Sequence, residues 1–171
     1  MTLRTNARVA GVTLWIYIAA GIASLLLAGR GGAPSVLSTV TSFCALVLGV
    51  TLYAITREQD RDLALAALLC RVVEAVPGEG AIYFAAGSLL FSWLLLRGQM
   101  IPAALAGLGV FGSGLLVVVL PLQRAGLFAG ALNWASGVTW LMWLPMLVFE
   151  LTLAMWFIVK GVAAPAPRVA A

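Results

Sequence analysis

Long runs of apolar residues, separated by short polar or Gly/Pro-rich stretches, make up most of the 171-residue chain. A helix that crosses a membrane needs about 20 predominantly apolar residues, and runs near this length recur from one end of the chain to the other. The pattern predicts six helices, over residues 9–28, 35–56, 62–76, 81–96, 100–120 and 138–159. We therefore expect an all-α, polytopic helical bundle with six transmembrane helices, forming a single membrane domain over residues 1–171.

The third and fourth predicted helices are short for full spans. The third is stopped by Pro77, which disfavours helix at the residue before it, and Arg97 closes the fourth. The alternative is that the two form one broken or re-entrant unit, which would leave four or five spans. Two other segments have expected roles: residues 121–137 as a lid or interfacial helix over the bundle, and residues 161–171 as a mobile tail.

The composition supports a membrane location. Hydrophobic residues make up 63% of the chain and charged residues 9%, whereas a soluble domain has about 25% charged residues. The basic residues stand singly at segment ends, so they do not form the basic face of a nucleic-acid-binding protein. With six spans, seven of them lie on the side of the N-terminus and two on the other, which predicts that both termini are cytoplasmic. The seven are Arg4, Arg8, Arg57, Arg61, Arg97, Lys160 and Arg168, and the two are Arg30 and Arg124.

The chain has no histidine, which removes imidazole as a metal ligand and as a general base. It contains no phosphate-binding loop, zinc motif or nucleophile elbow, and its Gly-x-Gly sequences fall within apolar helices with no preceding strand. We expect no cofactor and no metal. Any chemistry must then depend on carboxylates, arginine, tyrosine or thiols.

Three ionisable residues fall inside apolar segments: Arg71, Glu74 and Glu150. Arg71 and Glu74 are three residues apart and share a helix face. At a rise of about 1.5 Å per residue, Arg71 lies roughly 13 Å, Glu74 roughly 18 Å and Glu150 roughly 15 Å from the flanking charges on the cytoplasmic side. Because ionisable residues at this depth need partners, we predict one midplane site in which Arg71 reaches both carboxylates.

This site has three interpretations. One protonated and one ionised carboxyl could serve as general acid and general base, with Glu150 and Glu74 as the pair and Arg71 orienting them. The same groups could instead carry protons in a proton-coupled transporter, or tie two helices together in a structural or regulatory subunit. Residues expected to line the site are Tyr17, Tyr53, Tyr83, Asn133, Trp140 and Trp143.

The helix predicted over residues 100–120 is rich in small residues. Ala103 with Gly107, and Gly109 with Ser113, form small-xxx-small pairs that allow close approach of another helix. This face packs either against a helix of the same chain or against a second copy in a homo-oligomer.

The sequence also resembles a bacterial family of small multi-pass membrane proteins that is classed only as a domain of unknown function. The matching motifs are ARVAG, LYAITR, CRVVEA and FELTLAMWFIVKG. The resemblance implies a multi-span helical fold in the bacterial inner membrane, with Arg71, Glu74 and Glu150 as its signature, and it implies no activity. Our preferred interpretation is a membrane protein that binds a hydrophobic small molecule from the lipid bilayer, or isomerises or cyclises it in the manner of an isomerase or a cyclase-type lyase.

Overall fold

The computed structural model describes residues 2–27, 32–76, 80–127 and 137–164. Within them lie six helices, and the predicted all-α bundle is confirmed. The helices are α1 (Leu3–Leu26), α2 (Ala33–Thr56), α3 (Arg61–Glu74), α4 (Gly80–Arg97), α5 (Ala103–Arg124) and α6 (Gly137–Val159).

Five of the described helices, α1, α2, α4, α5 and α6, are long and apolar enough to cross a membrane. A multi-pass membrane protein is therefore confirmed. The helix α3 has 14 residues and a length of roughly 21 Å, against about 30 Å for the hydrocarbon core. It is the one described helix too short to cross alone.

Three helix ends lie three or more residues from the predicted ones, the start of the first helix and both ends of the fifth. The first helix starts at Leu3 because Thr2 caps it, with its Oγ1 accepting a hydrogen bond from the backbone N–H of Thr5 at 3.2 Å. The fifth helix starts after Pro102 and continues through Pro121 to Arg124, so the first residues of the predicted 121–137 connection are helical. Residues 128–136 and 165–171 lie outside the described part, and with them most of the predicted lid and tail.

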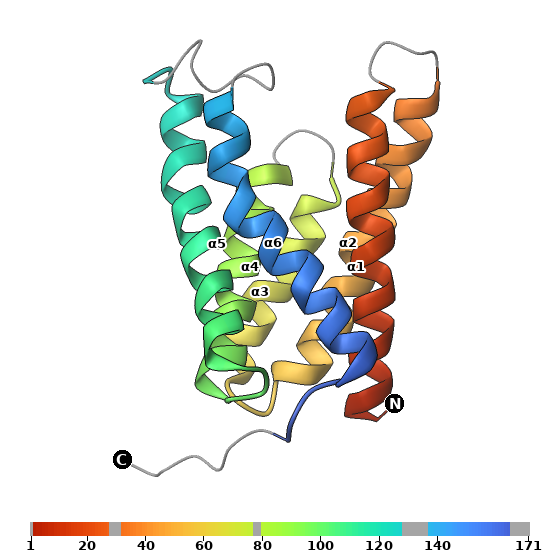
Figure 1. The fold of residues 1–171 in the computed structure, drawn as a ribbon, viewed down its shortest axis with the longest axis vertical. Helices are drawn as coiled ribbons and strands as arrows, with labels where there is room; N and C mark the ends of the chain where they lie inside the picture. Colours follow the sequence, from red (N-terminus) through yellow and green to blue (C-terminus); the bar gives the residue numbers. More distant parts are fainter. Residues whose placement is uncertain (1, 28–31, 77–79, 128–136, 165–171) are drawn as a thin grey trace.

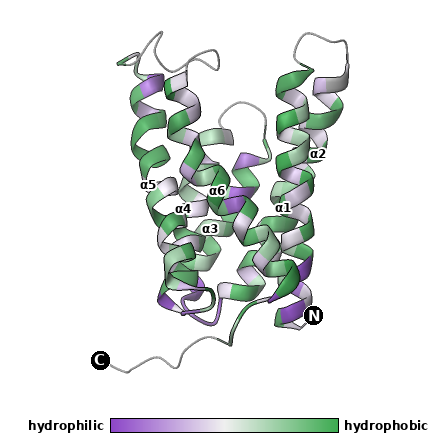
Figure 2. Ribbon diagram, in the orientation of Figure 1, coloured by the Kyte–Doolittle hydropathy of each residue, from purple (hydrophilic) through white to green (hydrophobic). Residues whose placement is uncertain are grey.

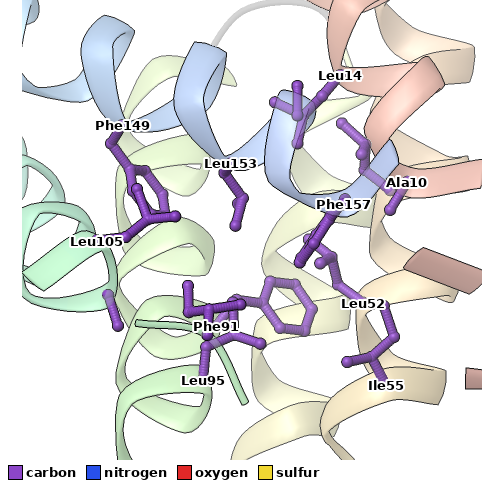
Figure 3. Packing of buried hydrophobic residues seen from close by; sticks show 14 of the residues in the cluster. Ala10, Leu14, Leu52, Ile55, Phe91, Leu95, Leu105, Phe149, Leu153 and Phe157 are labelled. Carbon is purple, nitrogen blue, oxygen red and sulfur yellow. The ribbon is translucent and has the colours of Figure 1, made fainter. Parts of the chain in front are cut away.

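The helices form a closed ring in which each packs against its neighbours along the chain, and α6 returns to α1. Figure 1 shows α6 crossing the front of the bundle, from α5 at one end to α1 at the other, with the start of α1 and the end of α6 at the same end. Side chains of α6 pack on those of α2 and α4 in the centre of the ring (Figure 3). The labelled members of this core include Leu52, Ile55, Phe91, Leu95, Phe149, Leu153 and Phe157.

Close helix contacts explain part of the small-residue pattern. A Cβ on Gly109 would lie 2.5 Å from Cζ of Phe149, and one on Gly112 would lie 3.1 Å from the backbone N of Met146, so α5 packs closely on α6. Gly109 and Ser113 are buried inside the chain, whereas a Cβ on Gly107 would meet nothing within 4 Å. Gly109 and Ser113 of the predicted small-residue face therefore pack against α6 of the same chain.

The hairpin of α3 and α4 is shorter than the rest of the bundle. In Figure 1, α3 ends and α4 begins well short of the ends of the four other helices on that side. Figure 2 shows hydrophilic residues at the opposite end of the bundle, near the start of α1, and again at the inner end of α3. The polar end of α3 is therefore surrounded by longer, mostly apolar helices.

Candidate functional site

A buried ion pair lies in the last turn of α3. The Nη1 of Arg71 is 2.8 Å from Oε2 of Glu74, and the two side chains are only 4% and 5% exposed. Tyr17, on α1, donates its hydroxyl hydrogen to Oε1 of Glu74 at 2.6 Å. Both carboxylate oxygens of Glu74 therefore have partners, which the burial of this charge requires.

The other end of the Arg71 guanidinium contacts α4. Its Nη2 donates to the hydroxyl of Ser88 at 2.8 Å, and its central carbon lies 5.0 Å from the ring centroid of Phe84. A Cβ on Gly49 would lie 2.9 Å from Cβ of Arg71, so α2 comes close to α3 only because residue 49 has no side chain. The sequence analysis missed Ser88; its signal was a small hydroxyl residue in an otherwise apolar helix.

Glu150 lies on the buried face of α6 and is 6% exposed. Among the described residues, its carboxylate forms no hydrogen bond and no ion pair within bonding distance. The predicted arrangement, in which Arg71 bonds to both carboxylates, is thus not present: the guanidinium pairs with Glu74. Arg71 and Glu150 do line the same small cavity of about 20 Å³, together with Ser88 and Ser92, and this volume has room for one water molecule.

A larger pocket of about 720 Å³ opens beside these groups. Its walls are formed by α1, α2 and α6, with the end of α3 and the start of α4 also contributing. The volume falls within the roughly 300–1,000 Å³ typical of small-molecule sites. The described charged residues in its wall are Glu74 and Glu150, and most of the remaining wall is apolar.

Aromatic side chains form one side of this pocket. The ring of Phe84 stacks with that of Tyr17, at 6.1 Å between centroids and 7° between planes, and with that of Trp143, at 5.9 Å and 27°. Trp140, one turn before Trp143 on α6, also lines the pocket. The stacking holds the rings of α1, α4 and α6 together and fixes the shape of the wall near Glu74.

The predicted lining residues have different positions. Tyr17, Trp140 and Trp143 line the pocket, whereas Tyr53 and Tyr83 are not among its described lining residues. Asn133 lies outside the described residues. The sequence analysis missed Phe84 and the hydroxyl residues of α2; the polar run STVTS at the start of that helix was the available signal. The described hydroxyl residues of α2 in the pocket wall are Ser38, Thr41 and Ser42.

The described residues contain no group of three or more His, Cys, Asp or Glu side chains that could hold a metal ion. What they contain is a buried arginine, two carboxylates and a tyrosine at the wall of an apolar pocket.

The fold and this site define an integral membrane protein of the multi-pass α-helical class, with a polar site buried among its helices. Residues 78–161 match the family DUF4386, described as a domain of unknown function, and this confirms the resemblance to such a family over those residues. The matched part contains the FELTLAMWFIVKG motif with Glu150, while Arg71 and Glu74 precede it. No match was found among curated proteins or among solved structures.

Proposed function

We propose that this protein binds a hydrophobic small molecule in the 720 Å³ pocket, and that the Glu150 carboxylate contacts the polar end of that molecule. The observation that carries the proposal is the position of Glu150: a buried carboxylate, without a bonding partner among the described residues, in the wall of a mostly apolar pocket. A buried carboxylate is costly unless another group bonds to it, and ionisable residues inside membrane proteins are usually functional.

The two carboxylates have different parts in this proposal. Glu74 is fixed by Arg71 and Tyr17, so its position is set before any ligand enters. Glu150 lies on a helix that contains Pro145, which removes a backbone hydrogen bond shortly before it and leaves room for adjustment. Glu74 thus serves as a fixed part of the wall, and Glu150 is the group that bonds to the ligand.

The distribution of basic residues indicates from which side of the membrane the ligand would enter. Most of the described basic residues lie near the helix ends on the side where α1 begins and α6 ends, which supports placing both termini in the cytoplasm. The pocket lies toward the other end, where the end of α3 and the start of α4 contribute to its wall. The α3–α4 hairpin then acts as a re-entrant unit that forms the floor of the pocket. A ligand would enter from the non-cytoplasmic half of the membrane, in a bacterium the outer leaflet of the inner membrane.

A second candidate is acid–base conversion of the bound molecule, by isomerisation or cyclisation. It is favoured by one specific observation: two carboxylates in different surroundings, one ion-paired and one without a bonding partner among the described residues, face the same pocket. Carboxylates in different environments can take the roles of acid and base. Glu150 would exchange the proton, and Glu74 would stay in contact with Arg71.

The test is to identify what the purified protein carries. The wild type, Glu150→Gln and Glu58→Gln are purified in parallel in lipid nanodiscs, and extracted small molecules are compared by mass spectrometry. Glu58 is 65% exposed and serves as the matched control. We expect the wild type and Glu58→Gln to carry a small molecule that is not one of the added lipids. The amount of this molecule should be at least tenfold lower in Glu150→Gln, whose helical circular dichroism should match that of the wild type. Equal retention by Glu150→Gln, or no molecule beyond the added lipid, would contradict the proposal.

A further inference from the structure

The small cavity of about 20 Å³ is lined by both Arg71 and Glu150, from α3 and α6. We infer that this cavity is a binding site for one water molecule, which accepts a hydrogen bond from Nε of Arg71 and bonds on its other side to the Glu150 carboxyl. The inference goes beyond the proposed function, because it does not depend on what the larger pocket binds.

The first argument is an unpaired donor on Arg71. The Nη1 of its guanidinium donates to Glu74 and the Nη2 to Ser88, each at 2.8 Å, whereas Nε has no hydrogen-bond partner among the described residues. The side chain is buried, so bulk water does not reach it. Nearly all buried N–H groups in proteins bond to another protein group or to an ordered water. The Nε of Arg71 therefore needs an acceptor that the described side chains do not supply.

The second argument is the volume of the cavity. A cavity needs about 10–15 Å³, on the same measure, to hold one water molecule, and the 20 Å³ here meets that need without room for a larger ligand.

The third argument is the chemistry of the lining. The polar residues around the cavity are Arg71, Ser88, Ser92 and Glu150, and the rest of its lining is apolar. An internal water makes about three hydrogen bonds, and these residues offer an N–H donor, two hydroxyls and a carboxyl. Because water both donates and accepts, it can bond to the Glu150 carboxyl whether that group is ionised or protonated. A cavity with only apolar walls would stay empty, but this one has partners for a water on several sides.

The water joins Glu150 to the network around Arg71. Tyr17, Glu74 and Arg71 are already connected by hydrogen bonds, and the water extends this chain to Glu150 on α6. Glu150 lines the larger pocket as well as the small cavity. Since a carboxyl has two oxygens, one can bond to the water while the other bonds to a molecule in the pocket. Arg71 is then a positioning residue for Glu150, acting through the water without a direct ion pair.

The test is nuclear magnetic resonance of the full chain in detergent micelles, with isotope-labelled arginine. The Nε–H signal of Arg71 is assigned by its loss in Arg71→Lys, and its cross-relaxation with water is measured in the rotating frame. A held water gives a contact peak opposite in sign to the diagonal, whereas hydrogen exchange with bulk water gives a peak of the same sign. We expect a contact peak for Arg71, and exchange peaks for Arg57 and Arg97, whose side chains are 56% and 55% exposed.

Variants of Glu150 test the other side of the bridge. Glu150→Gln keeps an acceptor oxygen and should keep the contact peak, while Glu150→Leu should reduce it at least threefold. Ser113→Ala is the control, because the Ser113 hydroxyl is buried but bonds to the backbone oxygen of Gly109 and does not line the cavity; it should leave the peak unchanged. In Ser88→Ala the peak should persist, since its source is the water and not the hydroxyl hydrogen of Ser88.

Three results would overturn the inference. The absence of a contact peak in the wild type would mean that Nε bonds directly to Glu150 or exchanges with bulk water, and no water site exists. A peak of full size in Glu150→Leu would show that the water does not bridge to Glu150. A peak lost in Ser88→Ala but kept in Glu150→Leu would assign it to the hydroxyl. The wild-type measurement stands even if a variant fails to fold, and it requires no ligand, so the proposed function is tested separately.

Discussion

The buried ion pair between Arg71 and Glu74 gives the most direct test of the site. The change Arg71→Met keeps an unbranched apolar side chain of similar reach and removes the guanidinium. It breaks the 2.8 Å contact with Glu74 and the 2.8 Å hydrogen bond to Ser88. Among the described residues, the Glu74 carboxylate then keeps its hydrogen bond from Tyr17.

The size of the effect follows from burial. The two side chains are 4% and 5% exposed, so water cannot replace the lost partner. Removing one member of a buried ion pair costs about 3–5 kcal/mol of unfolding free energy, because the other charge is left uncompensated. The matched control is Arg97→Met. The Nη1 of Arg97 lies 3.8 Å from Oδ2 of Asp60, and the two side chains are 55% and 30% exposed. Surface ion pairs of this kind contribute about 0–1 kcal/mol to the unfolding free energy.

The assay is equilibrium unfolding in mixed micelles, with a double-mutant cycle. Wild type, Arg71→Met, Glu74→Gln, the double variant and Arg97→Met are compared. The double variant should be more stable than Arg71→Met alone, with a coupling energy of about 2 kcal/mol or more, because Gln at position 74 no longer carries a charge that needs Arg71. If Arg71→Met costs no more than Arg97→Met, or if the effects of Arg71→Met and Glu74→Gln add, the buried ion pair does not stabilise the fold.

Two further predictions concern packing and hydrogen bonding around the site. Gly109→Ala should destabilise the fold by about 1–3 kcal/mol, because the new Cβ would lie 2.5 Å from the Phe149 ring. Gly107→Ala is the control: its new Cβ would have nothing within 4 Å, so stability should be unchanged or slightly raised. Equal effects of the two changes in thermal unfolding would refute the contact between Gly109 and Phe149. Tyr17→Phe should lower the unfolding free energy by about 1.5–3 kcal/mol, because the hydrogen bond to Glu74 is lost. In a Glu74→Gln background the same change should lower it markedly less. An equal decrease in both backgrounds would show that the Glu74 carboxylate is not the partner of Tyr17.

Several features follow from the sequence alone because they depend on local spacing. Apolar runs of about 20 residues predict membrane helices, and five of the described helices have that character. The three-residue interval between Arg71 and Glu74 places both on one helix face, and the structure brings them into an ion pair. The need for partners in a non-aqueous interior predicts that Glu150 faces inward, and it is buried.

The tertiary structure alone decided which partners these groups have. Tyr17 meets Glu74 from a helix 57 residues away, and Ser88 rather than Glu150 takes the second hydrogen bond of Arg71. Nothing in the sequence pattern shows this, because the lipid-facing and protein-facing sides of a membrane helix are both apolar and do not indicate the neighbouring helix. The pocket is decided in the same way: it exists because the α3–α4 hairpin stops short between longer helices, and that depends on how the six helices close into a ring.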